Sequence, residues 1–132
     1  MIFSAALDQR PVIDRTAPVT LAPLDTAPRT ARASVTAQLS AWGRGDLADD
    51  AGLIVSELMT NAVVASEAGE TPVAVRLLLT PASVVVEVYD RAPGFPLLAA
   101  AGAEAEAGRG LQIVASVATR WGWTPTTTGK CT

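Results

Sequence analysis

Two polar residues suited to binding a metal or a phosphate, Glu57 and Asn61, stand four positions apart in a mostly apolar segment. The surrounding apolar residues recur at three- and four-residue steps, the pattern of a helix with one apolar face: Ile54, Leu58, Ala62 and Ala65. Residues four apart on a helix share a face, so the carboxylate and the amide point the same way. Unpaired polar groups turned toward a core cost about 1–3 kcal/mol each, and a bound metal with a phosphate and a water would supply partners. The alternative is that Glu57 only borders solvent and Asn61 caps a neighbouring loop.

Composition excludes several other kinds of chemistry. The 132 residues suit one domain, and 49% hydrophobic residues allow a core of aliphatic side chains. The lack of histidine removes Ser-His-Asp and Cys-His catalysis and the commonest zinc ligand. The single cysteine, Cys131, excludes an internal disulfide, and there is no Gly-Lys-Ser/Thr sequence for a P-loop.

Charge and hydropathy limit which partners the protein can bind and where in the cell it is expected. A formal net charge of −3 argues against a surface that coats nucleic acid, so we expect no direct nucleic-acid partner. No apolar run approaches the ~20 residues of a membrane span. The N-terminus has no basic segment followed by an apolar core, so it does not predict a signal peptide. We therefore expect a cytoplasmic protein that does not associate with a membrane.

The first half of the chain predicts a short strand and two helices. Residues 1–17 have no clear period and are interpreted as an irregular or partly extended arm, followed by one domain over 18–132. A strand is predicted at 19–21, and a helix capped by Asp25 or Thr26 is predicted to end at Gly43 and Gly45. Asp46 is predicted to cap the next helix, which carries Glu57 and Asn61 and runs to about residue 66.

The second half predicts a hairpin, a loop and a third helix. Segments 72–79 and 83–89 are rich in Val and Leu and are joined by Thr80-Pro81-Ala82, which predicts an antiparallel hairpin. Residues 91–108 are rich in Ala, Pro and Gly and suit a lid loop. A helix pattern follows to about residue 119, then a strand candidate at 120–124. The chain stops after the turn at 126–129, so the domain is predicted to lack its last strand or to expose a sheet edge.

These elements predict an α/β fold of the α+β two-layer sandwich type. We expect a mixed, largely antiparallel sheet covered on one face by about three helices. No internal repeat or domain boundary is visible within 18–132.

Three motifs in this order resemble those of the Bergerat-fold, or histidine-kinase-like, ATP-binding domains. The segment from Glu57 to Ala62 is similar to the family's N box, and Asp90-Arg91-Ala92-Pro93-Gly94 is similar to its first glycine box. The family's second glycine box is similar to the segment Gly108-Arg109-Gly110-Leu111 together with the three residues after it. The resemblance covers roughly residues 18–130 and is nearest to the anti-sigma-factor serine kinases. It implies that ATP and Mg²⁺ bind between the helices and the lid loop.

The resemblance gives roles to the two glycine boxes. Asp90, at a strand end, would accept a hydrogen bond from the exocyclic amine of adenine; the plainer interpretation is a turn-forming Asp. Gly94 would let the backbone pass close to the base, although it also suits an ordinary Pro-Gly turn. Gly108, Gly110 and Leu111 would begin a helix whose amides bind phosphate, with Arg109 adding a direct contact or staying on the lid surface. A lone Gly-x-Gly is otherwise a hinge, and no third glycine supports a dinucleotide site.

The resemblance also implies that the N box holds the metal ion and supplies the catalytic base. Asn61 would offer Mg²⁺ a hard oxygen, and Glu57 would orient or deprotonate the attacking hydroxyl. Two positions depart from the family's pattern: Ala65 stands where relatives often carry a polar side chain, and Cys131 stands where a threonine is usual. Cys131 would be a weak thiol donor near the base or a plain buried strand residue.

Two functional hypotheses follow from the resemblance, and enzymatic activity is left open between them. The first is an ATP-binding regulatory protein that transfers phosphate to a serine of an anti-anti-sigma partner, sequesters a sigma factor, or both. The alternative is a nucleotide-binding interaction module without kinase activity. A purely structural α/β domain is disfavoured because the three motifs occur together. Related domains also often form a homodimer through the N-terminal strand and helix region.

Overall fold

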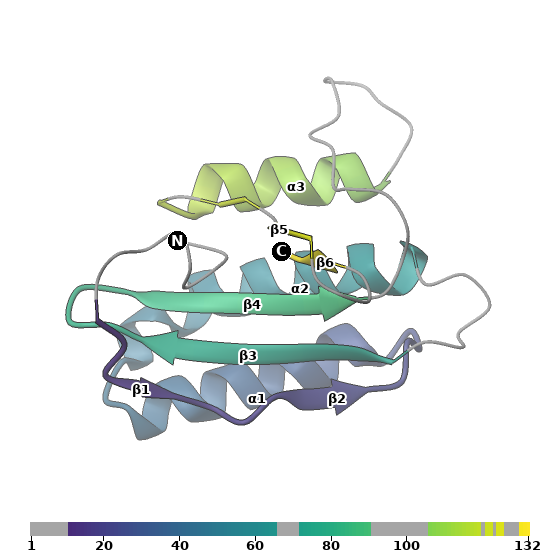
Figure 1. Ribbon diagram of the computed structural model, residues 1–132. Coiled ribbons are helices and arrows are strands. Elements are labelled where there is room, and N and C mark those ends of the chain that lie inside the picture. The colour runs from purple at the N-terminus through teal and green to yellow at the C-terminus, as the bar shows by residue number, and fades with distance from the viewer. Residues whose placement is uncertain (1–10, 66–71, 91–105, 120, 123, 126–129) are drawn as a thin grey trace.

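The computed structural model describes residues 11–65, 72–90, 106–119, 121–122, 124–125 and 130–132. The chain forms two layers, an antiparallel sheet and three α-helices packed on one of its faces (Figure 1). The helices are α1 (Ala27–Ala41), α2 (Ala48–Ala65) and α3 (Glu106–Val117). This confirms the predicted fold class, and every strand pairing among the described residues is antiparallel.

A long hairpin forms the centre of the sheet. Strands β3 (Val73–Leu79) and β4 (Val84–Asp90) pair in register from Ala74 opposite Tyr89 to Leu79 opposite Val84. The connecting turn is closed by Thr80, whose backbone N–H donates to the Ser83 carbonyl at 2.9 Å and whose hydroxyl accepts from the Ser83 N–H at 3.0 Å. The predicted hairpin is therefore confirmed.

Short strands complete both sides of the hairpin. Strands β1 (Asp14–Arg15) and β2 (Val19–Leu21) both pair with β3, so part of the segment predicted to be an arm joins the sheet. On the other side, β6 (Lys130–Cys131) lies between β4 and β5 (Thr124–Pro125). The strand predicted at 120–124 is thus shorter and later in the chain. A strand, β6, does follow residues 126–129 and pairs back against β5, whereas the sequence predicted that this strand would be missing.

The core lies between the sheet and the helices. Side chains alternate between the two faces of a strand, and Val84, Val86 and Val88 of β4 face the helices within one apolar cluster. Helix α1 contributes residues four apart, among them Ala31, Val35 and Leu39. Helix α2 is central, because it contacts α1, α3, β3 and β4. No helix among the described residues is both long and apolar enough to cross a membrane.

The junction between α1 and α2 differs in detail from the prediction. Helix α1 has Thr26 at its N-cap and ends at Ala41, and Gly43 has a φ of 72°, so the predicted glycine stop is confirmed. Asp46 does not stand immediately before α2. It lies inside a 3₁₀ turn, η2 (Gly45–Leu47), and its carboxylate pairs with Arg44. Asp49 and Asp50 occupy the first turn of α2, where the helix dipole favours negative charge.

Candidate nucleotide site

Three of the predicted segments meet at one end of the molecule. In Figure 1 the C-terminal end of α2, the end of β4 and the N-terminal end of α3 all lie at the right. Helix α2 contacts both α3 and β4, so this proximity is not an effect of the view. The structure therefore brings the segments that carry Glu57, Asn61, Asp90 and Gly108 to the same end of the two layers.

Glu57 and Asn61 are half-buried on α2 and differ from their polar neighbours in what they contact. The Ser56 hydroxyl donates to the Gly52 carbonyl at 2.8 Å, and the Thr60 hydroxyl donates to the Ser56 carbonyl at 2.8 Å. Neither the Glu57 carboxylate nor the Asn61 amide bonds to another side chain or backbone group within the described part of the chain. Their hydrogen-bonding groups are therefore available to a ligand. Asn61 is only half-buried, whereas its neighbours Leu58 and Ala62, which belong to the predicted apolar stripe, lie in the core.

Asp90 ends β4 on the face that packs against the helices. It continues the alternation of Val84, Val86 and Val88, and it is 6% exposed. A buried carboxylate requires polar partners, and Asp90 does interact with other groups of the protein. Its position between the layers suits the predicted contact with a base.

The two glycine boxes are only partly described. Gly94 and most of the predicted lid, 91–105, lie outside the described residues. Helix α3 begins at Glu106, two residues earlier than Gly108, so Gly108, Arg109, Gly110 and Leu111 lie inside its first turns and not before them. The first four N–H groups of a helix, counted from the residue before its first turn, lack intrahelical partners. That of Gly108 falls among them, whereas those of Arg109 and Gly110 are used within the helix.

Thr132 is a candidate that the sequence interpretation missed. It is 6% exposed, and its backbone N–H and carbonyl pair with Val88 at 2.8 Å each. Residues opposite each other in a sheet share a face, so Thr132 lies with Val88 and Asp90 on the side of the helices. Cys131, one position earlier, faces the other side and is a plain buried strand residue. The strand register, which the sequence does not reveal, decides which of the two could approach a nucleotide.

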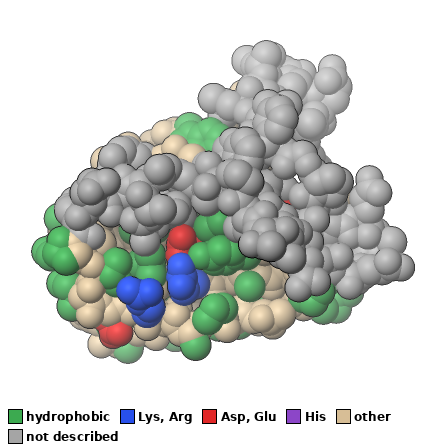
Figure 2. Space-filling view, viewed as in Figure 1, with side chains coloured by type: hydrophobic (Ala, Val, Ile, Leu, Met, Phe, Trp, Pro, Cys, Tyr) green, Lys and Arg blue, Asp and Glu red, His purple; other side chains and the backbone are tan. Residues whose placement is uncertain are grey.

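The outer face of the sheet carries a separate polar cluster of Arg76, Glu87, Tyr89 and Cys131. Arg76 Nη2 lies 2.6 Å from Glu87 Oε1 and donates to the Tyr89 hydroxyl at 2.8 Å, while Cys131 Sγ lies 3.6 Å from Glu87 Oε2. Figure 2 views this face and shows basic and acidic side chains in contact beside hydrophobic ones. Burial, followed by the nearby Glu87 charge, raises the pKa of the Cys131 thiol to about 12. The thiol is therefore protonated at neutral pH and poorly nucleophilic.

The donor set at the nucleotide end fits magnesium and a triphosphate. Asn61 provides one neutral hard oxygen, which suits an ion that takes its other ligands from phosphates and water. Among the described residues, no three carboxylate or thiol groups gather into a metal-binding cluster. The N-terminal end of α3 provides free N–H groups and a positive dipole end for phosphate.

The two-layer fold has an Asn-bearing central helix, a buried acid at a strand end and a helix with glycines in its first turns. Together these features define an ATP-binding domain. The model of the histidine kinase-like ATPase domain family matches residues 21–132. The chain belongs to that family, and membership implies that it binds ATP. A comparison with curated proteins finds no match to this chain.

Proposed function

We propose that the protein is a Mg²⁺-dependent regulatory kinase that transfers the γ-phosphate of ATP to a serine on a protein partner. The observation that supports this most is the pair Glu57 and Asn61, whose side chains are half-buried yet uncommitted at the end of the molecule that holds Asp90. Binding ATP requires no base. A carboxylate one helical turn from the proposed metal ligand is placed to take a proton from a hydroxyl.

In the proposed step, the serine oxygen attacks the γ-phosphorus and the bond to the ADP oxygen breaks. Glu57 takes the serine proton, and the leaving charge stays on ADP. Asn61 would hold the magnesium ion that neutralises the phosphates, Gly108 would donate a backbone N–H group to them, and Arg109 would add a direct contact. By resemblance, the partner is an anti-anti-sigma protein, and the same domain would sequester a sigma factor in a cytoplasmic complex. Asp90 and Thr132 would hold the base, with Gly94 and Leu111 completing the pocket.

Binding is tested by titrating Mg-ATP and following thermal unfolding. A ligand present at 100 times its Kd stabilises a protein by about 2.7 kcal/mol, so the wild-type midpoint should rise by several degrees. Asp90→Asn and Asn61→Ala should abolish most of this rise. Thr132→Val should weaken ATP binding about fivefold by removing one hydrogen bond, and Thr132→Ser should restore it. Asp49→Asn, at the other end of α2, is the matched control and should bind like wild type.

Catalysis is tested with γ-labelled ATP and the proteins that co-purify with the chain. Wild type should label a serine of one partner, whereas Glu57→Gln should bind Mg-ATP normally and transfer no label. If wild type binds ATP normally but transfers no phosphate to any partner, the kinase proposal is overturned. The alternative, a nucleotide-binding interaction module, then remains. Failure of wild type to bind Mg-ATP would overturn both.

A further inference from the structure

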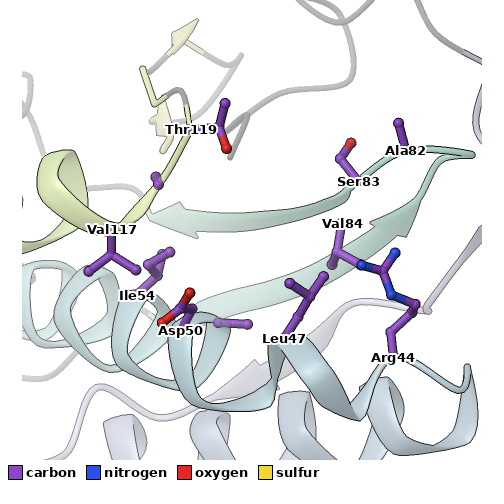
Figure 3. Close-up of a pocket in the computed structure, with 11 residues that line it drawn as sticks. Arg44, Leu47, Asp50, Ile54, Ala82, Ser83, Val84, Val117 and Thr119 are labelled. Atoms are coloured by element: carbon purple, nitrogen blue, oxygen red, sulfur yellow. The ribbon is translucent and has the colours of Figure 1, made fainter.

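A second pocket lies at the opposite end of the two layers from Asp90. It has a volume of about 170 Å³ and forms where the start of α2, the end of α3 and the β3–β4 turn meet (Figure 3). None of the predicted site residues lines it. It is a feature of the chain that the nucleotide site does not explain.

The pocket has an apolar floor and a polar rim. The floor includes Leu47, Ile54, Val84 and Val117, which come from η2, α2, β4 and α3. The rim carries the polar side chains Arg44, Asp50, Ser83 and Thr119. In Figure 3 these floor and rim side chains surround one hollow, with Thr119 and Ser83 on the sheet side and Asp50 on the helix side.

The rim is acidic because Arg44, its only cation among the described residues, is already paired. Arg44 Nε and Nη2 lie 3.1 and 3.2 Å from the two carboxylate oxygens of Asp46, which neutralises the guanidinium. Asp50 has no ion-pair partner in the described ranges, and the exposed Asp49 stands beside it. Asp50 therefore places one carboxylate without an ion-pair partner on the border of an apolar hollow, on a chain whose formal net charge is −3.

The size and charge together select an occupant. A cavity of about 150 Å³ lined by aliphatic side chains holds a benzene-sized group, so this hollow fits one large aliphatic side chain. Asp50 is exposed at the rim of the hollow, which favours a polypeptide that continues past the rim over a ligand enclosed by the pocket. We propose that this pocket docks an aliphatic side chain of a basic segment in a partner protein, with Asp50 contacting the adjacent basic residue.

The proposal is tested with blocked dipeptide amides and ¹⁵N NMR of the whole chain. Acetyl-Leu-Arg-amide should shift the backbone signals of Leu47, Asp50 and Val117, with millimolar affinity. Acetyl-Leu-Glu-amide lacks the cation and acetyl-Gly-Arg-amide lacks the apolar anchor, so each should bind at least fivefold more weakly. Raised salt should weaken the Leu-Arg peptide, because the rim is exposed to solvent.

Matched variants separate the pocket from the rest of the surface. Asp50→Asn should weaken the Leu-Arg peptide at least threefold, and Asp49→Asn, in the same helical turn, should change it less than twofold. Ala118→Leu fills the pocket and should abolish binding, whereas Ala115→Leu, on the exposed side of α3, should not. Equal binding of all three peptides, or Leu-Arg binding that survives Ala118→Leu, would overturn the proposal. Mg-ATP binding by the Ala118→Leu variant verifies that it is folded. If Ala118→Leu is unfolded, the result for Asp50→Asn decides the outcome.

Discussion

At the scale of single residues, the Glu87 carboxylate is a buried charge that lies apart from the candidate nucleotide site. Its side chain is 3% exposed on the outer face of the sheet, and Arg76 supplies its compensating charge. Burial by itself lowers the pKa of Arg76, but the hydrogen bond and charge of Glu87 outweigh this and leave that pKa raised. Removing the cation therefore leaves a buried anion without its ion-pair partner.

We expect Arg76→Met to lower the free energy of unfolding by about 3–5 kcal/mol, because the Glu87 charge stays buried without compensation. The double variant Arg76→Met with Glu87→Met should regain most of that loss, since neither charge remains. Urea unfolding at pH 7 measures both. Arg44→Met breaks an exposed pair instead and should cost less than about 1 kcal/mol. Equal losses in the Arg76 and double variants would contradict this account.

Some candidate site residues could be proposed from the sequence and others could not. Glu57, Asn61 and Asp90 were identified because a helical period and a strand end are local features, and the structure brings their segments together. Thr132 was missed because its relevance depends on strand register, and a shift of one residue exchanges the two faces of a strand. The tertiary pairing of β6 with β4, not a local pattern, turns Cys131 toward Glu87 and Thr132 toward the helices.

At the scale of elements, the long periodic segments were predicted well and the short ones poorly. The two long strands and the first two helices show strong patterns, and their boundaries agree to within about two residues. Strands of two residues such as β1, β5 and β6 carry no detectable period and form only because a neighbouring strand is already in place. The start of α3 was predicted at Gly108, two residues too late, because the glycines were interpreted as the beginning of the helix.

The turn between α1 and α2 allows a test of one backbone conformation. Gly43 has a positive φ of 72°, whereas the nearby Gly45 does not, and a Cβ at either position would meet nothing within 4 Å. Gly43→Ala should therefore cost about 1 kcal/mol through backbone strain alone, and Gly45→Ala should be neutral or slightly stabilising. The difference in urea midpoints between the two variants measures this. A Gly45→Ala loss as large as that of Gly43→Ala would contradict it.

At the scale of the whole molecule, two helices connect the two ends of the domain. Helix α2 carries Asp50 near its start, at the docking pocket, and Asn61 near its end, at the nucleotide end. Helix α3 runs in the opposite direction, with Gly108 at the nucleotide end and Val117 at the docking pocket. Both ends therefore depend on the same helix-to-sheet packing. Any loss of global stability will affect both, and each binding measurement needs a folding control.

The global stability should fall in alkaline solution because of the outer cluster. The pKa of Cys131 rises from 9.0 to about 12 in the folded chain, through burial and then the Glu87 charge. Burial, followed by the charges of Cys131 and Glu87, also raises the pKa of Tyr89 above its ordinary 10.0. Above pH 9 the unfolded thiol loses its proton while the folded thiol keeps it. The unfolded state then binds fewer protons, and the free energy of unfolding decreases as pH rises.

The Cys131→Ser variant separates the contribution of the Cys131 thiol to this loss of stability from that of Tyr89. For one such group the slope is at most about 1.4 kcal/mol per pH unit, and the Cys131 contribution is fully present below pH 9 and lost by about pH 12. Serine can still donate to Glu87 but does not titrate in this range, so the variant should lose stability less steeply between pH 9 and pH 10. Above pH 10 the Tyr89 contribution remains in both proteins. Urea unfolding in reductant at pH 8, 9, 10 and 11 measures the two slopes. Identical slopes from pH 9 to pH 10 would show that the Cys131 thiol ionises equally in the folded and unfolded states.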